Sequence, residues 1–375
     1  MAKHLVLVGA GHAHLTTLAG LTETCALGAR VTVIGPGTYH YYSGMGPGAL
    51  GGYYTPAEIR FNVERLTRNQ GGTFLKDRVV SFDPQAKILS TEHHGTIDYD
   101  IVSFNVGSRV PNPLSGPTGQ NVYPVKPIEN LLAAARHIAG LVEQGHPPRV
   151  LVIGGGPAGF EVAGNVRHLI RSLGEEMPDV TLVAGRQLLP SFPERVCTLA
   201  AANLFKRNIT LLQGVRAVQL TEDELVLSDE RRLPYDVVFL AMGVAPPALF
   251  TNAGVADSSG ALPVNKFLQH PEYPDIFGGG DCISFLPNPL AKVGVYPVRE
   301  NPILKHNLDA SVAGEPLMPF TDTDPNFLLI LNCGDGTGIF RKKNFIFSGR
   351  IAFFIKDFID KRFMRKFQVS GERED

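Results

Sequence analysis

One supersecondary unit occurs twice in this chain. A short apolar run at 4–8 ends in a glycine turn at 9–11, and a segment of helical periodicity then leads to a second apolar run at 30–34. The same succession begins again at 149–153, where the turn 154–159 reads Gly-Gly-Gly-Pro-Ala-Gly. Strand, glycine turn, helix and strand in this order form the βαβ unit that binds dinucleotides. The chain is therefore predicted to be an α/β protein with two Rossmann-like nucleotide-binding domains.

The repetition extends beyond the glycine turns. Each βαβ unit is followed by a segment of alternating polarity, 87–91 in the first half and 224–227 in the second. A Tyr-Asp pair and an apolar strand that ends in glycine come next, over 99–107 and 235–243, and the spacing from tyrosine to glycine is eight residues in both. A single Gly-x-Gly arises easily by chance, whereas two that share the following strand at matched spacing indicate a duplicated domain.

The order of these segments predicts where the chain passes between the two domains. A helical segment at 128–142 leads to the breaker Pro147-Pro148, which precedes the second unit. After the second unit, 276–282 has the pattern of a strand, a glycine turn and an acid, and its position predicts a return to the first domain. We expect the first domain to comprise 1–125 and 265–320, the second 126–264, and a C-terminal part of strands and an amphipathic helix 321–375.

Composition and cysteine spacing disfavour several classes of protein. The 375 residues carry a formal net charge of −1, which gives no sign of a nucleic-acid partner. The four cysteines are far apart, with no Cys-x-x-Cys pair, which argues against a disulfide framework and a local redox dithiol: they are Cys25, Cys197, Cys282 and Cys333. Neither a signal sequence nor an apolar run of about eighteen residues is evident, so we expect a cytoplasmic protein that contacts a membrane only peripherally.

Together, the two glycine turns, the paired Tyr-Asp strands and Gly279-Gly280-Asp281 resemble the two-dinucleotide-domain flavoprotein family. This family includes the pyridine nucleotide-disulfide oxidoreductases, the type II NADH dehydrogenases and the sulfide:quinone oxidoreductases. The resemblance implies a glutathione-reductase-like fold whose first domain binds FAD non-covalently, with Asp281 hydrogen-bonded to the ribityl chain, and whose second domain binds NADH or NADPH. The flavin residues that it implies are Gly9, Gly11, His12, Ala13, Gly35, Pro36, Ser43, Gly44, Met45, Val80, Asn105, Val106, Gly107, Gly280, Asp281, Tyr296 and Pro297. Those implied for NAD(P) are Gly154, Gly156, Gly159, Arg186 and Gly243.

Two further segments are similar to one subgroup of this family. The stretches 42–48 and 292–300 resemble the flavoprotein extension found ahead of selenide, water dikinase, which is in turn similar to the type II NADH dehydrogenases. That extension also has histidines at the positions of His12 and His14. The disulfide-reductase branch is disfavoured because the chain lacks a cysteine pair. The sulfide:quinone branch is disfavoured because Pro157 stands where those enzymes carry a cysteine near the second glycine turn.

Both domains lack the acid that commonly follows the second strand of a dinucleotide fold. In the first domain that strand ends in Gly35-Pro36, so we expect main chain around Val80 to hold the adenosine end. In the second domain Arg186 stands in this place, where it could pair with the 2′-phosphate of NADPH. NADPH, NADH and the loss of nicotinamide binding all remain open.

The first glycine turn carries His12 and His14, which raises the alternative of a metal site. Main-chain N–H groups and the helix dipole at such a turn favour an anion and disfavour a cation. We therefore predict no metal, and expect the FAD pyrophosphate to lie over Gly11 and His12. Because His14 replaces the glycine that governs how closely helix meets strand, either the helix stands off the sheet or the imidazole fills the gap.

The C-terminal segment 341–367 is strongly basic, with nine basic and two acidic residues. Apolar residues share one face of its helical wheel: Ile351, Phe354, Ile355, Phe358 and Ile359. A basic amphipathic helix is typical of binding to an anionic membrane surface, and the similar type II NADH dehydrogenases use such helices to sit on the membrane. We expect a peripheral location on the inner face of the cell membrane. The alternative is that this helix packs on its own protein or on a second subunit of a homodimer.

These features predict the passage of electrons from NAD(P)H through FAD to a quinone or a similar small acceptor. The flavin carries the redox chemistry in such enzymes, and the protein positions it. Two acids are candidates for a catalytic role: Glu161, at the start of the helix after the second glycine turn, and Glu300, where the family usually has glutamine. The alternatives are a sulfide- or selenium-linked flavoprotein reductase and a flavin-binding interaction protein without turnover.

Overall fold

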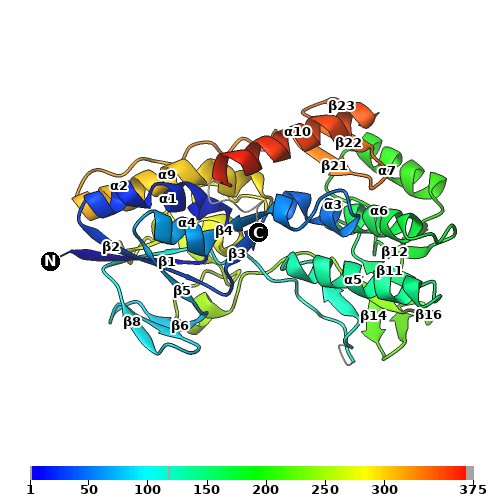
Figure 1. Ribbon diagram of the computed structural model, residues 1–375, viewed down its shortest axis with the longest axis horizontal. Coiled ribbons are helices and arrows are strands. Elements are labelled where there is room, and N and C mark those ends of the chain that lie inside the picture. Colours follow the sequence, from blue (N-terminus) through cyan, green and yellow to red (C-terminus); the bar gives the residue numbers. More distant parts are fainter. Residues whose placement is uncertain (1, 117–118, 369–375) are drawn as a thin grey trace.

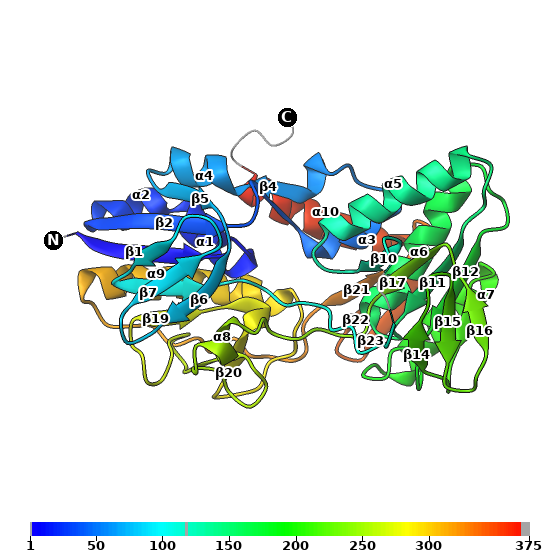
Figure 2. The same ribbon diagram turned by 90° about the horizontal axis from the view of Figure 1, so that it is seen from below.

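The computed structural model describes residues 2–116 and 119–368, and these form two parallel β-sheets at opposite ends of an elongated molecule (Figures 1 and 2). Each sheet has five strands and is covered by helices, so the predicted α/β class with two Rossmann-like domains is confirmed. The C-terminal helix α10 (Arg350–Phe367) runs along one side of the molecule between the two ends (Figure 1).

The first sheet has the strand order β19-β9-β1-β2-β5, and β1 pairs in parallel with both β2 and β9. The helical segment predicted between the glycine turn and the apolar run 30–34 is interrupted, because a 3-10 turn, α1 and α2 follow one another and the two helices meet at Gly20. A Cβ atom on Gly20 would lie 2.5 Å from Cε of Lys305 in α9, so close packing requires a glycine that also weakens the helix. The bounds are β1 Lys3–Val8, η1 His12–His14, α1 Leu15–Ala19, α2 Leu21–Ala26, β2 Ala29–Gly35, β5 Thr73–Lys76, β9 Ile101–Phe104, β19 Ile276–Gly278 and α9 Val295–Ala313.

The second sheet repeats this arrangement with the order β10-β17-β11-β12-β13. Its first βαβ unit is β11, α6 and β12, as the sequence predicted. The bounds are β10 Val122–Pro124, α5 Glu129–Glu143, β11 Arg149–Ile153, α6 Pro157–Ser172, β12 Asp179–Val183, α7 Glu194–Lys206, β13 Thr210–Leu212 and β17 Val237–Leu240.

The two Tyr-Asp pairs have the same structural role. The carboxylate of Asp100 accepts the backbone N–H of His4 at 2.6 Å, and that of Asp236 accepts the backbone N–H of Arg149 at 2.7 Å. Each aspartate therefore joins the strand that it precedes to the strand that begins the βαβ unit. This explains why the sequence repeats the pair at matched spacing.

The sheets differ from the predicted domain boundaries in two places. β10 pairs with β17 in the second sheet, although it lies before 126. It is three residues long and ends in proline, so it carries no alternating pattern that would mark it as a strand. Near the other boundary, Phe250 contacts the rings of Phe82 and Phe104, so the segment before 264 already packs on the first domain.

Smaller elements complete the two ends. Three-stranded antiparallel sheets follow each βαβ unit: β6 Val79–Asp83, β7 Ile88–Thr91 and β8 Thr96–Asp98 in the first half, and β14 Ala217–Leu220, β15 Glu224–Leu227 and β16 Arg232–Pro234 in the second. The remaining small elements are β3 Tyr39–Tyr41, η2 Ser43–Met45, α3 Gly46–Leu50, η3 Ala57–Ile59, β4 Arg60–Asn62, α4 Val63–Asn69, α8 Leu249–Asn252, β18 Leu262–Val264, η4 Gly280–Cys282 and β20 Ile283–Phe285. Of these, α3 packs on α5 and α6 of the second half.

The C-terminal part forms an antiparallel sheet followed by the single helix α10. The strands are β21 Leu329–Asn332, β22 Gly338–Lys342 and β23 Phe345–Gly349. The buried face of α10 contacts the rest of the protein through Ala352, Asp360, Met364 and Phe367. Within residues 2–116 and 119–368, no helix combines the length and the apolar composition needed to cross a bilayer.

Candidate functional site

A cavity of about 490 Å³ opens at the carboxyl ends of the first sheet. Its wall combines the glycine turn after β1, the end of β2, the loop after β9 and the Gly-Gly-Asp loop after β19. Most of the predicted flavin residues line it: Gly9, Gly11, His12, Gly35, Pro36, Ser43, Val80, Asn105, Val106, Gly107, Gly280, Asp281 and Pro297. Four others do not line it: Ala13, Gly44, Met45 and Tyr296.

The glycine turn brings backbone to the cavity wall in a way that only glycine permits. Gly9 has φ +85°, and a Cβ atom there would lie 2.4 Å from the carbonyl oxygen of Asn105. A Cβ atom on Gly11 would lie 2.2 Å from Oδ1 of the same asparagine, which accepts the N–H of Ala13 at 3.1 Å. Because the cavity is bounded by backbone at this turn, the residues present fit a dinucleotide whose pyrophosphate approaches the main chain.

His14 fills the gap left by the missing third glycine. Its side chain is fully buried, with Nδ1 2.6 Å from the carbonyl oxygen of Gly9 and Nε2 2.8 Å from Oγ of Ser103. A carbonyl only accepts, so Nδ1 carries the proton and Nε2 accepts from the serine. Burial lowers the pKa of His14 to about 4, and the ring is neutral at pH 7. Both nitrogens are used, which leaves His14 no atom for a metal ion.

His12 belongs to an aromatic cluster at the edge of the cavity. Its Nδ1 lies 3.2 Å from Nε2 of His40, and its ring stacks on Phe363 of α10 with centroids 6.1 Å apart. Burial lowers the pKa of His12 to about 4 and that of His40 to about 3. A neutral pair linked by one hydrogen bond results. His40 lies in β3, and sequence reasoning missed it because only the fold brings it to the glycine turn.

Asp281 lies on the cavity wall in a cluster that the sequence did not predict. Its Oδ2 accepts Nζ of Lys126 at 2.6 Å and Oγ of Ser108 at 2.8 Å. Burial alone would raise the pKa of Asp281, but the ammonium of Lys126 outweighs it and holds that pKa below its ordinary value. The carboxylate is therefore charged at neutral pH. Lys126 is 155 positions from Asp281 in the chain, so no local pattern marks it.

The far end of the cavity lies where the adenosine was expected. Gly35, Pro36 and the segment 77–80 line it, and the N–H of Asp77 bonds the carbonyl oxygen of Gly35 at 3.0 Å. The carboxylate of Asp77 accepts backbone N–H groups from Arg78, His93 and His94. Asp77 therefore connects the loop after β5 with the loop that carries His93 and His94. It does not take the place of the acid that commonly follows the second strand of a dinucleotide fold.

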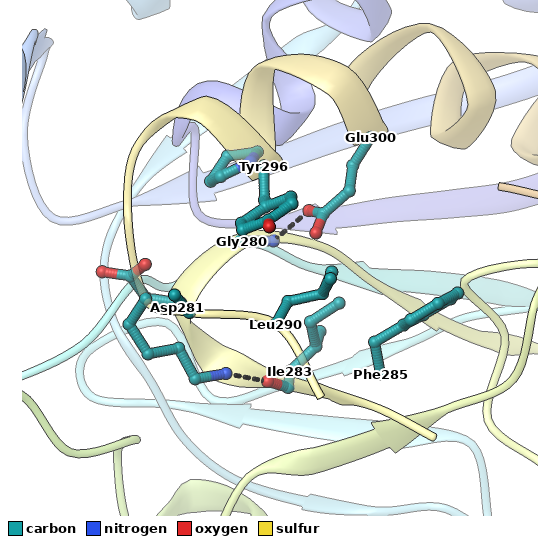
Figure 3. A pocket seen from close by; sticks show the side chains of 10 residues that line it. Gly280, Asp281, Ile283, Phe285, Leu290, Tyr296 and Glu300 are labelled. Carbon is teal, nitrogen blue, oxygen red and sulfur yellow. Dashed lines mark hydrogen bonds between the residues drawn. The ribbon is translucent and has the colours of Figure 1, made fainter. Parts of the chain in front are cut away.

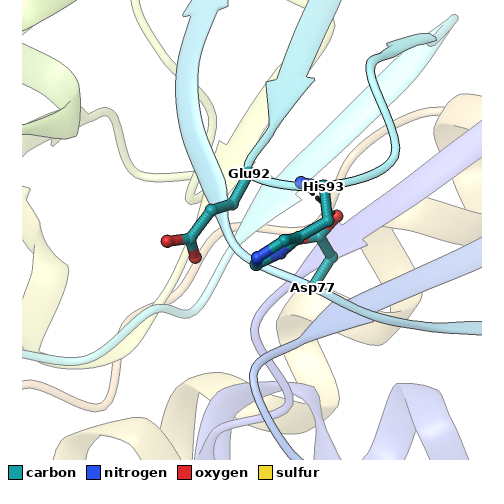
Figure 4. A group of neighbouring side chains, drawn as sticks. All are labelled: Asp77, Glu92 and His93. Carbon is teal, nitrogen blue, oxygen red and sulfur yellow. Dashed lines mark hydrogen bonds and ion pairs between the residues drawn. The ribbon is translucent and has the colours of Figure 1, made fainter.

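Asp77 is also the centre of a group with metal-ligand chemistry (Figure 4). Oxygen atoms of Asp77 and Glu92 and a ring nitrogen of His93 lie within 4.8 Å of one another. However, Nδ1 of His93 lies 3.1 Å and Nδ1 of His94 lies 2.6 Å from the same carboxylate, in addition to the backbone donors. The carboxylate is satisfied by protein groups, and this arrangement needs no ion.

Glu300 is buried under the Gly-Gly-Asp loop (Figure 3). Its Oε2 accepts the backbone N–H of Gly280 at 2.6 Å. Burial raises the pKa of Glu300 to about 7. The side chain lines a second, small cavity beside the large one and is not part of the large cavity's wall.

Glu161 lies in a different buried cluster, between α6, β21 and α10. Its Oε1 accepts the backbone N–H of Asn332 at 2.7 Å, and burial raises its pKa to about 7. Lys356 of α10 donates to Asp360 at 2.6 Å and to the carbonyl oxygen of Gly44 at 2.7 Å. Burial alone would lower the pKa of Lys356, but Asp360 and Glu161 outweigh it and raise that pKa. The cluster joins the second domain to the loop that carries Ser43.

Three histidines whose pKa values are lowered to about 4 or below predict how stability depends on pH. The pKa values of His12, His14 and His40 lie below the ordinary 6.5, so below pH 6.5 the unfolded chain binds protons that the folded protein excludes until about pH 4. Each histidine should therefore remove about 1.4 kcal/mol of unfolding free energy per unit of falling pH. Glu161 and Glu300, whose pKa values are raised to about 7, act in the opposite direction over the same range.

The histidine contribution is isolated by comparing variants. The unfolding free energy is measured with urea at pH 6 and at pH 5. Its fall between these two pH values should be about 1.4 kcal/mol smaller in His14→Gln than in the wild type. Gln144→Asn, an exchange of exposed amides that removes no titratable group, is the control and should keep the wild-type dependence. Equal pH dependence in the wild type and His14→Gln would contradict a neutral, buried His14.

The second glycine turn has the geometry of a nucleotide loop. A Cβ atom on Gly154 would lie 2.1 Å from the carbonyl oxygen of Ala241, and one on Gly159 would lie 1.8 Å from that of Gly154. Gly156 precedes α6 and has open space around it. Arg186 and Gly243 are exposed, in the turns that follow β12 and β17. These positions agree with the predicted NAD(P) surface, whose role stays a prediction.

None of the four cysteines lines the large cavity, although Cys282 directly follows Asp281. The thiol of Cys282 is buried against the carbonyl oxygens of Phe104 and Gly279, and burial raises its pKa to about 12. Burial likewise raises the pKa of Cys333 to about 12. Buried thiols of this kind pack as small apolar side chains.

Comparison with known proteins gives consistent matches. The family model described as pyridine nucleotide-disulphide oxidoreductase matches residues 3–302. A type II NADH:quinone oxidoreductase from Staphylococcus saprophyticus is 26 % identical over 388 residues, covering 96 % of this chain and 94 % of the relative. One from Staphylococcus aureus is 25 % identical over 395 residues, covering 98 % and 96 %.

Solved structures share the fold. The sulfide:quinone oxidoreductase from Aquifex aeolicus has a TM-score of 0.80 at 19 % identity, over 98 % of this chain and 92 % of that one. NDH2 from Plasmodium falciparum, in complex with NADH, has a TM-score of 0.75 at 14 % identity, over 98 % and 100 %. The family match covers most of the chain and both glycine turns. The chain therefore belongs to the pyridine nucleotide-disulphide oxidoreductases, a family of oxidoreductases that use FAD and NADH.

Proposed function

We propose that this protein passes electrons from NAD(P)H through FAD to a quinone. The observation that carries the proposal is the large cavity, whose wall unites the first glycine turn with the Gly-Gly-Asp loop. The similarity to type II NADH:quinone oxidoreductases over nearly the whole chain supports the same donor and acceptor.

When bound, FAD supplies a two-electron carrier that accepts hydride from a nicotinamide and reduces a quinone. Gly9 and Gly11 allow the main chain to approach the pyrophosphate. Lys126 and Ser108 hold Oδ2 of Asp281, and we assign its Oδ1 to the ribityl chain. This arrangement orients a charged carboxylate without movement on binding.

Glu161 is the residue that we assign to proton handling near the acceptor. It is buried, its pKa is raised to about 7, and Lys356 and Asp360 of α10 lie beside it. A carboxyl group with a pKa near the working pH both accepts and releases protons readily. Glu161 would thus serve the proton demand of quinone reduction.

The nicotinamide preference rests on Arg186, which we propose favours NADPH by pairing with its 2′-phosphate. Its exposed position after β12 leaves the guanidinium accessible to a ligand. NADH remains the donor named for the Staphylococcus relatives, so both must be tested.

The test is anaerobic reduction of the purified yellow protein by NADH, NADPH and sulfide, each added separately, followed by a soluble quinone. We expect NADPH or NADH to bleach the flavin absorbance and the quinone to restore it. If neither nicotinamide reduces the flavin, the proposed donor is wrong. If only sulfide does, the alternative of a sulfide- or selenium-linked reductase holds, and bound flavin without any turnover would favour an interaction protein.

Within this family, we propose that the chain is related to the flavoprotein extension found ahead of selenide, water dikinase. This proposal is supported by Tyr42 and Tyr296 within the two similar segments and by His12 and His14 in the glycine turn. His12 lines the cavity, whereas His14 is bonded to the carbonyl oxygen of Gly9 in the glycine turn. This resemblance makes a sulfide- or selenium-linked flavoprotein reductase the second candidate.

We propose that α10 places the protein on an anionic membrane at the inner face of the cell membrane. Its predicted apolar face is uncovered: Ile351, Phe354 and Phe358 are 70, 69 and 55 % exposed. The opposite face packs on β21, β22 and β23 and, through Phe363, on Tyr42 of the first domain. Membrane binding is therefore proposed for one face of α10, and packing on the protein itself is seen for the other. Exposed apolar residues beside exposed Arg362, Arg365 and Lys366 suit a membrane interface.

Point changes test this surface better than truncation, because removing α10 would also remove buried Lys356 and Asp360. In flotation with phosphatidylglycerol-containing vesicles, Phe354→Glu combined with Phe358→Glu should lower the partition constant for the membrane about a hundredfold. The reason is that each phenylalanine buried in the membrane contributes about 1.5 kcal/mol. Met177→Glu, at another exposed apolar residue, is the control and should float as the wild type does. Unchanged flotation of the double variant would contradict membrane docking. Loss of a dimer in light scattering instead would assign the face to a second subunit.

A further inference from the structure

A water-sized cavity lies beside the flavin cavity, on the other side of the Gly-Gly-Asp loop (Figure 3). Its volume is about 10 Å³, which is the room that one water needs. Its wall includes Glu300, Tyr296 and Lys292. Gly280, Asp281, Lys292 and Pro297 line both cavities, so two short segments, 280–281 and 292–297, separate the two spaces.

Glu300 is the one carboxyl group that reaches this small cavity from α9. It is 1 % exposed, and its hydrogen-bond donor is the uncharged backbone N–H of Gly280. The ammonium of Lys292, on the wall of the same small cavity, donates instead to the carbonyl oxygen of Ile283. A buried carboxyl group without a bonded cation responds strongly to charge that appears nearby.

The other groups around Glu300 do not offer the same response. Asp281 in η4 is held charged by Lys126, and His12 and His14 in η1 are held neutral by burial. Burial keeps the thiol of Cys282 in η4 protonated, and α1, β19 and β9, which also pack on α9, carry no titratable side chain. Glu300 is therefore the titratable group whose protonation is free to follow the charge in the large cavity.

We propose that Glu300 takes up a proton when the bound flavin is reduced and releases it when the flavin is reoxidised, with water in the small cavity as the carrier. This inference rests on the proposed function, since it needs FAD in the large cavity. Reduction by two electrons and one proton leaves a negative charge on the flavin side of the loop. A second proton then neutralises the carboxylate of Glu300 and compensates that charge. Reoxidation by a quinone consumes two electrons and two protons as the hydroquinone forms, so Glu300 gives up its proton and returns to the carboxylate.

The test is the pH dependence of the flavin midpoint potential, measured by chemical reduction without nicotinamide or quinone. If one additional proton is bound per two electrons, the equilibrium constant for reduction changes by a further factor of ten for each pH unit. For a two-electron couple this factor corresponds to 29.6 mV in the midpoint potential. Above pH 7 the wild-type potential should fall 29.6 mV per pH unit more steeply than that of Glu300→Gln. Glu315→Gln, the same change at an exposed residue just beyond α9, should behave as the wild type does.

A second measurement needs only the wild-type protein. At pH 8 in weak buffer, reduction should take up two protons per flavin, one for the flavin and one for Glu300. Uptake of a single proton, or equal slopes for the wild type and Glu300→Gln, overturns the inference and leaves the proposed function standing. A purified protein that binds no FAD overturns both.

Discussion

Replacing Gly9 with alanine should cost the protein its bound flavin. Gly9 has φ +85°, where an alanine is strained by about 1–2 kcal/mol. The new Cβ atom would also lie 2.4 Å from the carbonyl oxygen of Asn105, which follows the neighbouring strand β9 and also lines the cavity. Relief of this contact must move backbone, so the shape of the cavity changes where the pyrophosphate is expected.

We expect the dissociation constant of FAD, followed by flavin fluorescence, to rise at least a hundredfold, because about 3 kcal/mol of strain and misfit corresponds to that factor. Gly140→Ala is the matched control. Gly140 lies inside α5 with nothing within 4 Å of a new Cβ atom, so this change should keep FAD bound and add up to about 1 kcal/mol of stability. Wild-type FAD affinity in Gly9→Ala would show that the cavity is not the flavin site.

Glycine positions of this kind were predictable from sequence, because the chemistry that requires them is local. A turn with positive φ and close backbone contact admits one residue type, and the spacing to the next strand is fixed by the βαβ unit. The Tyr-Asp pairs were visible for a similar reason, since Asp100 and Asp236 each join two strands in the same way.

The remaining parts of the site come from segments that are distant in sequence. Lys126 reaches Asp281 because the chain crosses to the second sheet beside the cavity. His40 reaches His12 only because β3 folds over the glycine turn. A lysine and a histidine in ordinary surroundings carry no pattern that distinguishes them from solvated residues. Such side chains reach the site only through the tertiary packing of distant segments, and the periodicity of a sequence does not specify that packing.

The contact between α10 and the flavin domain predicts a large loss of stability on replacing Lys356 with methionine. Its ammonium is 12 % exposed and pairs with Asp360, whose side chain is 7 % exposed. Methionine keeps most of the volume but leaves the carboxylate buried without a cation and the carbonyl oxygen of Gly44 without its donor. Removing one partner of a buried pair costs about 3–5 kcal/mol. Urea unfolding should show a loss of this size.

Two further variants separate the charge from the packing. Lys361→Met makes the same change in the same helix, but this lysine is 38 % exposed and pairs with Asp357, so the loss should be about 1 kcal/mol or less. Adding Asp360→Asn to Lys356→Met removes the uncompensated charge and should recover more than half of the lost stability, because an amide is far less costly to bury than a carboxylate. If Lys356→Met and Lys361→Met lose equal stability, the buried pair does not hold α10 in place. The position of Gly44 would then depend on Phe363 and its ring contacts instead, because Phe363 lies 4.9 Å from Tyr42, ring centre to ring centre.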